Sequence, residues 1–367
     1  MKHVLIILGT RPEAIKLAPI LLQLKKHKRL KGLLCNTEQQ KELSNQTLHF
    51  FGLQADFSLN VMRKNQALPG LQARLLERIS AIFKKYSIDA VVVQGDTMSV
   101  LCGALVGFYH RVPVFHVEAG LRSYDLFEPF PEEAIRQMTS RISTFHFAPT
   151  QRAKEALLKE DIKEKNILVT GNTGIDALYM LPSKTIRSAQ VSLRRLGVSQ
   201  RNLILITVHR RENHGKRLEA IIAAIKKLAF LYSNYQFVIP VHPNPNVCQK
   251  IHSQLGQIKN ILLCRPLDYP ELVCLMESSA LILTDSGEIQ EEAPSFGVPL
   301  LVLRYETERG EGVKKGLAKL VGAEEETIVR ETSLILNGKR KTYKKQNPYG
   351  DGKAAQRIIR MIDKLLK

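Results

Sequence analysis

Residues 281–299, LILTDSGEIQEEAPSFGVP, contain the pattern on which the fold prediction rests. The apolar run at 281–283 predicts a buried strand, the polar turn at 284–287 ends it, and residues 289–296 predict the helix that follows. The first N–H groups of a helix are unpaired and the helix dipole is positive there, so such a turn suits a phosphate. We therefore expect a nucleotide phosphate at this turn, with Glu291 and Glu292 able to bond sugar hydroxyls. For this stretch on its own, an ordinary capped helix in an α/β domain is the alternative.

The composition is that of a globular protein with an excess of positive charge. The chain has 367 residues, which is enough for two domains, and 44% of them are hydrophobic. No apolar run approaches the ~20 residues of a transmembrane helix, and the N-terminal MKHVLIILGTRPE predicts a strand, not a signal peptide. The net charge of +19 comes from scattered basic residues that are not interleaved with aromatic residues. We expect a solvated surface that attracts an anionic substrate, and no nucleic-acid or membrane partner.

The cysteines and the glycine-rich turns argue against several kinds of site. The five cysteines are odd in number and form no C-x-x-C pair, which indicates reduced thiols in a cytoplasmic protein and no metal site. They are Cys35, Cys102, Cys248, Cys264 and Cys274. The turn after the first predicted strand is not G-x-G-x-x-G, so we predict no NAD and no other cofactor.

Apolar strands and amphipathic helices alternate twice along the chain. The predicted strands are 3–8, 31–36, 88–94, 112–117, 145–148 and 167–170, and then 203–208, 236–240, 261–264, 281–283 and 300–303. This alternation predicts an α/β protein with two doubly wound, Rossmann-like parallel-sheet domains facing a cleft. We place the N-terminal domain at 1–171, the C-terminal domain at 172–350, and a last helix, 351–367, packing back on the N-terminal domain.

Carboxylates follow the predicted strands of the first half, and ligands of open parallel sheets bind at the carboxyl ends of strands. Asp96 and Glu118 occupy two such ends, as paired acid/base groups require, although Asp96 could instead cap the next helix. Glu132 and Arg136 are spaced to face the same side of a predicted helix. Arg136 therefore either keeps a third carboxylate ionised or forms a plain surface ion pair.

Basic and anion-binding groups come mainly from the second half. The candidates for substrate binding there are His209, Arg210, His242, Ser286 and Arg309. Arg11 and Lys16, after the first predicted strand, could also meet a diphosphate. We expect a nucleotide held mainly by the second half, with chemistry done by the carboxylates of the first half, in the cleft between them.

Ten ordered motifs, spread over nearly the full length of the chain, resemble those of the non-hydrolysing UDP-N-acetylglucosamine 2-epimerases. They are GTRPEAIK (9–16), QGDT (94–97), HVEAGLRS (116–123), FPEEAIR (130–136), GNTGIDAL (171–178), HRREN (209–213), PVHPNP (240–245), LTDSGEIQEEAPSFGVP (283–299), TER (307–309) and NPYGDGKAAQRI (347–358). The resemblance implies a two-domain glycosyltransferase-B-type fold. It also implies interconversion of UDP-N-acetylglucosamine (UDP-GlcNAc) and UDP-N-acetylmannosamine (UDP-ManNAc), in which UDP is eliminated to leave a 2-acetamidoglucal and is then added back.

The same resemblance implies roles for individual residues. Asp96, Glu118 and Glu132 match the acid/base carboxylates, Arg136 a supporting arginine, and His209 a histidine on the nucleotide side. The positions that match those holding UDP are Arg11, Lys16, Ser286, Gly287, Glu292 and Arg309, with Glu292 on the ribose hydroxyls. The resemblance further implies a homodimer and a product used for surface polysaccharide.

The chain departs from the family at Glu288, where a second glycine is usual. A carboxylate about 4 Å from a phosphate, at an effective dielectric constant of about 20, costs about 4 kcal/mol. We therefore expect poor UDP binding unless Glu288 points outward. Three other functions stay open: a hydrolysing epimerase that releases UDP and N-acetylmannosamine, a glycosyltransferase that needs an acceptor, and a UDP-sugar-binding protein with weak or no turnover.

Overall fold

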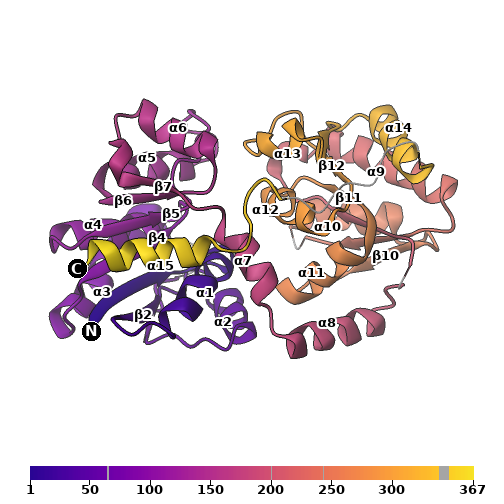
Figure 1. Ribbon diagram of the computed structural model, residues 1–367. Helices are drawn as coiled ribbons and strands as arrows, with labels where there is room; N and C mark the ends of the chain where they lie inside the picture. The colour runs from indigo at the N-terminus through magenta and orange to yellow at the C-terminus, as the bar shows by residue number, and fades with distance from the viewer. Residues whose placement is uncertain (64–65, 200, 243, 339–346) are drawn as a thin grey trace. The chain divides into compact units, whose positions relative to one another are not determined.

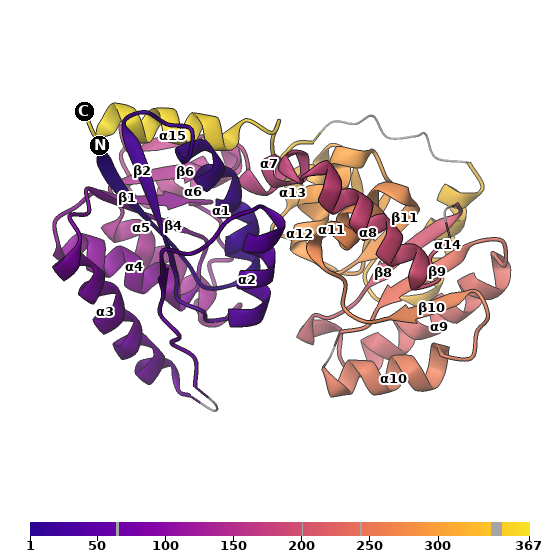
Figure 2. The same cartoon turned by 90° about the horizontal axis from the view of Figure 1, so that it is seen from below.

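Each half of the chain folds around its own parallel β-sheet (Figures 1 and 2). The computed structural model describes residues 1–63, 66–199, 201–242, 244–338 and 347–367. By its internal contacts the chain forms two compact units. Unit 1 comprises Met1–Leu181 together with Tyr349–Lys367, and unit 2 comprises Pro182–Pro348.

Unit 1 contains a seven-stranded sheet in the order β3-β2-β1-β4-β5-β6-β7, and its paired strands are parallel. The strands are β1 (Lys2–Leu8), β2 (Leu30–Asn36), β3 (Phe57–Ser58), β4 (Ala90–Gln94), β5 (Val114–Val117), β6 (Phe145–Ala148) and β7 (Ile167–Val169). The helices are α1 (Arg11–Leu24), α2 (Lys41–Phe50), α3 (Leu68–Lys85), α4 (Met98–Tyr109), α5 (Glu132–Ile142), α6 (Gln151–Lys159), α7 (Thr173–Met180) and α15 (Ala354–Leu365).

The centre of this sheet is buried on both faces. Residues 4–8 of β1 and 90–93 of β4 are apolar and 0% exposed, as expected for strands that helices cover on each side. The helices form two groups, with α2, α7 and α15 against α1, and α3 and α5 against α4. The C-terminal helix α15, yellow in Figure 1, belongs to the first group. Asp176 on α7 accepts hydrogen bonds from the N–H groups of Ala354 and Ala355, at 3.2 and 2.8 Å. These two bonds fix the start of α15.

Unit 2 contains a six-stranded parallel sheet in the order β10-β9-β8-β11-β12-β13. The strands are β8 (Leu203–Thr207), β9 (Gln236–Pro240), β10 (Ile261–Cys264), β11 (Ser279–Thr284), β12 (Leu300–Val302) and β13 (Ala318–Leu320). The helices are α8 (Ser183–Arg195), α9 (Lys216–Leu231), α10 (Pro245–Leu255), α11 (Tyr269–Ser278), α12 (Gly287–Glu292), α13 (Gly310–Lys314) and α14 (Glu325–Leu336). One face of the sheet packs on α9 and α14 through a core of aliphatic residues.

The predicted fold class, two parallel-sheet α/β units, is confirmed. The predicted and observed structures differ in two short strands and in the helix that follows β11. The strands β3 and β13 were not predicted, because two or three residues carry no periodicity. The single helix predicted over 289–296 is wrong: α12 ends at Glu292 and a 3₁₀ turn, Ala293–Phe296, follows. Pro294 lacks an N–H group and cannot continue the α-helical hydrogen bonding. No helix in the described part of the chain is long and apolar enough to cross a membrane.

The loop after β5 depends on Gly120, and a substitution there tests how tightly this loop is fixed. Gly120 has φ +92°, and a Cβ atom at this position would collide with the backbone carbonyl oxygen of Ala153. Gly52 is a matched control, since its φ is +64° but a Cβ there would meet nothing within 4 Å. We predict that Gly52→Ala lowers the free energy of unfolding by about 1 kcal/mol through backbone strain alone. Gly120→Ala should cost about 2 kcal/mol more because the loop must also move.

Urea unfolding of the two variants, followed by a probe in unit 1, measures this difference. Equal losses in the two variants would show that the loop yields to an added methyl group, and that Gly120 does not fix it.

Candidate functional site

The order of the strands locates a binding edge in each unit. In unit 1 the direction of winding reverses between β1 and β4, and in unit 2 it reverses between β8 and β11. Ligands of open α/β sheets bind outside the carboxyl ends of the strands at this reversal. The residues that follow these strand ends include Arg11 and Asp96 in unit 1, and His209 and Ser286 in unit 2.

Lys16 and Glu118 form a buried ion pair at the edge of unit 1. Lys16 Nζ, from the second turn of α1, lies 2.6 and 2.8 Å from the two carboxylate oxygens of Glu118. The two residues are only 7% and 9% exposed, and Gln94 Nε2 also donates to Glu118 Oε2. Glu118 adopts φ +61°, in the left-handed region, as the chain leaves β5. The ammonium group that the sequence assigned to a diphosphate is thus bound to one of the predicted acid/base carboxylates.

Asp96 is bound by Arg136 and does not cap a helix. The cap of α4 is Thr97, whose side chain accepts a hydrogen bond from the Val100 N–H. Arg136 Nη2 lies 2.6 Å from Asp96 Oδ2, and the Asp96 side chain is 27% exposed. The predicted carboxylate and arginine therefore meet, although they come from a strand end and from helix α5.

Glu132 does not pair with Arg136 as its spacing suggested. The second partner of Arg136 is Glu133, with Nη1 3.1 Å from Glu133 Oε2. Glu132 Oε2 is buried and has no hydrogen-bond partner within the described residues. Burial alone would raise the pKa of Glu133, but the hydrogen bonds from Gln137, Ser123 and Arg136 outweigh it and hold that pKa below its usual range.

The turn between β1 and α1 is closed by Glu13. Glu13 Oε2 accepts hydrogen bonds from the N–H groups of Gly9 and Thr10 at 2.7 and 2.8 Å, and the Thr97 hydroxyl donates to Oε1. Burial raises the pKa of Glu13 to about 7, against the smaller opposing effect of these bonds. The position of Glu13 three residues after Thr10 is the sequence signal of a capping box. Arg11 begins α1 beside this turn, and its N–H group donates to Gln40 Oε1 at 3.1 Å.

Asp285 organises the edge of unit 2. It is fully buried and accepts hydrogen bonds from the N–H groups of His209 and Arg210 and from Asn213 Nδ2, each at 3.0 Å. Its Oδ1 also lies 3.0 Å from Nδ1 of His209. This carboxylate, which sequence reasoning missed, therefore joins the end of β11 to the loop after β8. Its position directly after a buried strand was the available signal.

Two histidines of unit 2, His209 and His242, lie together, and Asp285 raises the pKa of the first. The rings of His209 and His242 stack with their centroids 5.8 Å apart. Burial lowers the pKa of His209, but the hydrogen bond and charge of Asp285, with the charge of Glu288, outweigh it, so the pKa lies above its ordinary value. Burial and the charge of His209 lower the pKa of His242. One of the two stacked rings is therefore the preferred site of a positive charge.

Arg309 lies against the first turn of α12 because residue 287 is glycine. A Cβ atom at Gly287 would come within 2.8 Å of Arg309 Cζ. The guanidinium is held by Glu291 and Glu308, with Nε–Oε1 and Nη1–Oε1 distances of 3.0 and 3.1 Å. The charges of Arg304 and Arg309 add to burial in lowering the pKa of Arg210, so three guanidinium groups share this region. Such a concentration of cations favours an anionic ligand.

The remaining predicted residues of α12 and its turn fall into buried and exposed groups. Ser286 is buried, and its N–H group donates to Thr284 Oγ1 at 3.0 Å. Glu292 is 6% exposed and accepts a hydrogen bond from the Tyr269 hydroxyl at 3.2 Å. Glu288 is exposed, which is the outward position that the sequence required for a phosphate to be tolerated at this turn.

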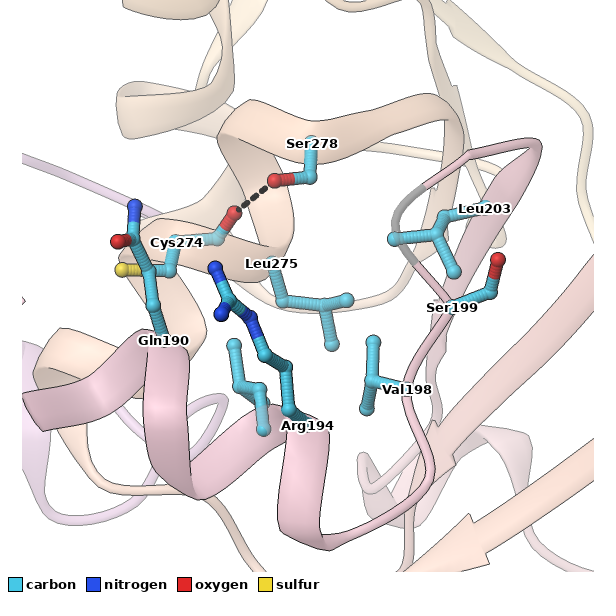
Figure 3. A pocket seen from close by; sticks show the side chains of 9 residues that line it. Gln190, Arg194, Val198, Ser199, Leu203, Cys274, Leu275 and Ser278 are labelled. Carbon is cyan, nitrogen blue, oxygen red and sulfur yellow. Dashed lines mark hydrogen bonds between the residues drawn. The ribbon is translucent and has the colours of Figure 1, made fainter. Parts of the chain in front are cut away.

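A pocket of unit 2 lies at the opposite ends of the strands and holds none of the predicted residues (Figure 3). It is formed by α8, α11 and the start of β8, with Leu193, Leu203 and Leu275 among its lining residues. Burial raises the pKa of its Cys274 to about 11, so this thiol stays protonated at neutral pH. Since the ligand-binding edge of the sheet is at the carboxyl ends, we do not assign this pocket to the candidate site.

The two units thus carry different chemistry. Unit 1 offers three carboxylates, Asp96, Glu118 and Glu132, with a bound cation beside each of the first two. Unit 2 offers arginines, a histidine whose pKa Asp285 raises, and the turn at the start of α12. Carboxylates serve in proton transfer, and the cations of unit 2 suit a diphosphate. Within the described residues, no group of three His, Cys, Asp or Glu side chains is placed to hold a metal ion.

Comparison with known proteins identifies what this chain resembles. A family described as UDP-N-acetylglucosamine 2-epimerase matches residues 22–363. The UDP-N-acetylglucosamine 2-epimerase of Neisseria meningitidis serogroup A is 42% identical over 98% of each chain. The Bacillus subtilis enzyme of the same name is 43% identical over 97% of this chain and 93% of its own.

Solved structures agree with these sequence matches. The Neisseria meningitidis UDP-GlcNAc 2-epimerase bound to UDP-GlcNAc superposes with a TM-score of 0.90 at 40% identity, covering 99% of this chain and 100% of that one. The Staphylococcus aureus MnaA–UDP structure gives a TM-score of 0.87 at 38% identity, covering 100% and 97% of the two chains.

The titration of His209 tests the role of Asp285. A raised pKa means that His209 keeps its proton to higher pH in the folded protein than in the unfolded protein. The stabilisation from its contact with Asp285 is therefore complete below the pKa of His209 in the unfolded protein, and it is lost as the pH rises through the pKa of His209 in the folded protein. We predict that Asp285→Asn moves the NMR titration midpoint of His209 to lower pH, and that Glu288→Gln moves it less. The signal is assigned by its loss in His209→Asn. A midpoint unchanged in Asp285→Asn would contradict this account.

Proposed function

The chain belongs to the UDP-N-acetylglucosamine 2-epimerase family, and we propose that it interconverts UDP-GlcNAc and UDP-ManNAc by the non-hydrolysing route. The observation that carries this proposal is the similarity of the whole chain: relatives of that name align with 98% of it at 42% identity, so the similarity includes both units. A solved relative with a TM-score of 0.90 binds UDP-GlcNAc. Inversion at C2 of such a sugar is an isomerisation that needs acid/base groups and a place for the nucleotide.

We propose that unit 2 holds UDP. His209 and Arg309 are suited to the diphosphate, because one favours its protonated form and the other is a guanidinium held by two carboxylates. Ser286 and Gly287 begin the helix whose N-terminal turn would face the phosphates. Glu292 would accept hydrogen bonds from the ribose hydroxyls, and His242 would support His209 through their stacked rings.

Holding UDP by cations also lowers the barrier to its departure. When the C1–O bond breaks, the electron pair leaves with the diphosphate, whose oxygens gain negative charge. Cations and N–H groups placed beforehand at those oxygens stabilise this charge more in the transition state than in the ground state. The cation-rich region around Arg309 supports this role.

We propose that unit 1 moves the proton at C2. In the elimination, a base takes the C2 proton while UDP leaves C1, which gives a 2-acetamidoglucal with a C1–C2 double bond. In the reverse addition, an acid returns a proton to the opposite face of C2 as UDP attacks C1. Because the proton leaves one face of C2 and returns to the opposite face, the reaction needs more than one acid/base group. Asp96, Glu118 and Glu132 supply carboxylates for this purpose.

The partners of these carboxylates suggest how they differ. Lys16 binds both oxygens of Glu118 and Arg136 binds Asp96, so each of these carboxylates has a cation within 2.6 Å. Glu132 has a buried oxygen without a hydrogen-bond partner in the described residues, which a substrate hydroxyl or amide could satisfy. Arg11, beside the turn that Glu13 closes, is the remaining candidate for a contact with the diphosphate.

We further propose that the protein acts in the cytoplasm as a homodimer. The five cysteines are free, and Cys35, Cys102 and Cys274 are buried, which suits a reducing compartment. Exposed apolar side chains on neighbouring helices support self-association: Phe108 and Tyr109 on α4 and Met138 on α5 are 53%, 65% and 47% exposed.

Proton exchange at C2 tests the reaction. We predict that incubation of UDP-GlcNAc with the protein in D₂O yields UDP-ManNAc with deuterium at C2, observed by ¹H NMR, and that free N-acetylmannosamine does not accumulate. Free sugar without UDP-ManNAc would identify a hydrolysing epimerase. Binding of UDP without any C2 exchange would identify a binding protein, and either result would overturn the proposal.

Glu288 provides a second test, of the UDP site. Since this carboxylate is exposed, its interaction with a phosphate 4 Å away is reduced to about 1 kcal/mol. We predict that Glu288→Gln tightens UDP binding by about fivefold or less, measured by calorimetry. Glu326→Gln, at another exposed position of unit 2, should leave the affinity unchanged. A gain of about a hundredfold in Glu288→Gln alone would show that this carboxylate opposes the diphosphate in a dry site.

A further inference from the structure

Glu133, the neighbour of Glu132 on α5, is a buried carboxylate with four hydrogen-bond donors around it. It is 0% exposed. Its Oε2 accepts from the Ser123 N–H at 3.0 Å and from Arg136 Nη1 at 3.1 Å, and its Oε1 accepts from Gln137 Nε2 at 3.0 Å and from the Tyr124 N–H at 3.4 Å. A buried charge is costly unless it is fully bonded, and these four donors provide the bonds that Glu133 needs.

Two of these donors belong to the segment that carries Glu118. Residues 118–124 leave β5 through positive φ angles at Glu118, Gly120 and Tyr124 (61°, 92° and 65°). A segment with so little regular hydrogen bonding depends on side chains to fix it. Glu133 binds its far end at Ser123 and Tyr124, while Lys16 and Gln94 bind its near end at Glu118.

The third donor connects Glu133 to Asp96. Arg136 divides its guanidinium between the two carboxylates, with Nη1 on Glu133 and Nη2 2.6 Å from Asp96 Oδ2. The Arg136 side chain is 11% exposed, so little water screens these contacts. Glu133 therefore holds the guanidinium group that contacts Asp96, and places a negative charge beside it.

We propose that Glu133 is a positioning residue for the epimerase reaction, which fixes the Glu118 segment and, through Arg136, fixes the place of Asp96 and the net charge beside it. This inference rests on the proposed function, because it assumes that Asp96 and Glu118 exchange protons with the substrate. Glu133 itself has no access to the substrate, since it is fully buried. Its effect on the reaction passes through Asp96, whose side chain is 27% exposed, and through the segment that carries Glu118.

Other ionisable groups face the same region and must be separated from the effect of Glu133. Burial lowers the pKa of His116 on β5 to about 4, so this ring is neutral at neutral pH. Arg122 is paired with Glu160 at 2.7 Å. Glu13, bonded to Thr97 next to Asp96, has a pKa of about 7 and titrates in the working range. These residues are present in every variant, so a difference between variants begins with the change at Glu133.

The experiment compares Glu133→Gln, Glu133→Asp and the wild-type protein in the rate of UDP-ManNAc formation across the acid limb of the pH profile. With the amide, Arg136 loses the negative charge beside it, and this added positive charge at the site favours the loss of protons from the groups that react. We expect kcat to fall about 10- to 100-fold, KM to stay within about threefold, and the acid limb to move to lower pH. Glu133→Asp keeps the charge, so the limb should return to its wild-type position while kcat recovers only in part.

Glu331→Gln is the matched control. Like Glu133, Glu331 is buried, at 3% exposure, and it is ion-paired with Lys319 Nζ at 2.7 Å. It lies on α14 in unit 2, whereas the proposed acid/base carboxylates belong to unit 1. It should lower the melting temperature without moving the acid limb. UDP affinity of each variant shows that unit 2 is intact.

A wild-type kcat and acid limb in Glu133→Gln would overturn the inference, as would a loss of kcat with the limb unmoved. If Glu133→Gln does not fold, Glu133→Asp decides, since an unchanged kcat in that variant would refute a positioning role. Failure of the wild-type protein to exchange the C2 hydrogen would instead refute the proposed function.

Discussion

The parallel direction of the strands is the constraint on which the candidate site depends. In a parallel sheet all strands end at the same edge, so polar residues that follow different strands meet there without being close in sequence. In unit 1 this brings Lys16, after β1, against Glu118, after β5, in a buried ion pair. In unit 2 it brings Asp285, after β11, against His209, after β8. The Lys16–Glu118 pair is shielded from water on both sides, whereas in the second pair Asp285 is buried and the His209 side chain is 38% exposed.

The two edges use buried carboxylates in the same way. Glu133 in unit 1 and Asp285 in unit 2 each accept backbone N–H bonds from a loop and bind one cationic side chain, Arg136 or His209. These carboxylates hold their partners in place, and Asp285 also raises the pKa of His209. The residues proposed to meet the substrate, such as Asp96 and His209, are more exposed and owe their position to them.

Much of the fold follows from the sequence, because the buried strands are continuous apolar runs bounded by polar turns. The strands at 145–148, 236–240 and 261–264 were predicted at their observed bounds. The contacts within the site could not be predicted in the same way. Helical spacing suggested that Arg136 faces Glu132, but the guanidinium group contacts Glu133 and Asp96. That contact depends on how α5 packs against α4 and β5. The link between residues 209 and 285 likewise required the strand order, which the sequence alone does not provide.

The central claim is that the sugar–UDP bond breaks and re-forms during epimerisation. The most direct measurement is positional isotope exchange in UDP-GlcNAc labelled with ¹⁸O in the bridge between C1 and the β-phosphate, followed by ³¹P NMR. If UDP is eliminated and held at unit 2, the β-phosphate can rotate, and the account predicts that ¹⁸O moves into its non-bridging positions as UDP-ManNAc forms. Epimerisation with the label retained entirely in the bridge would contradict the elimination route.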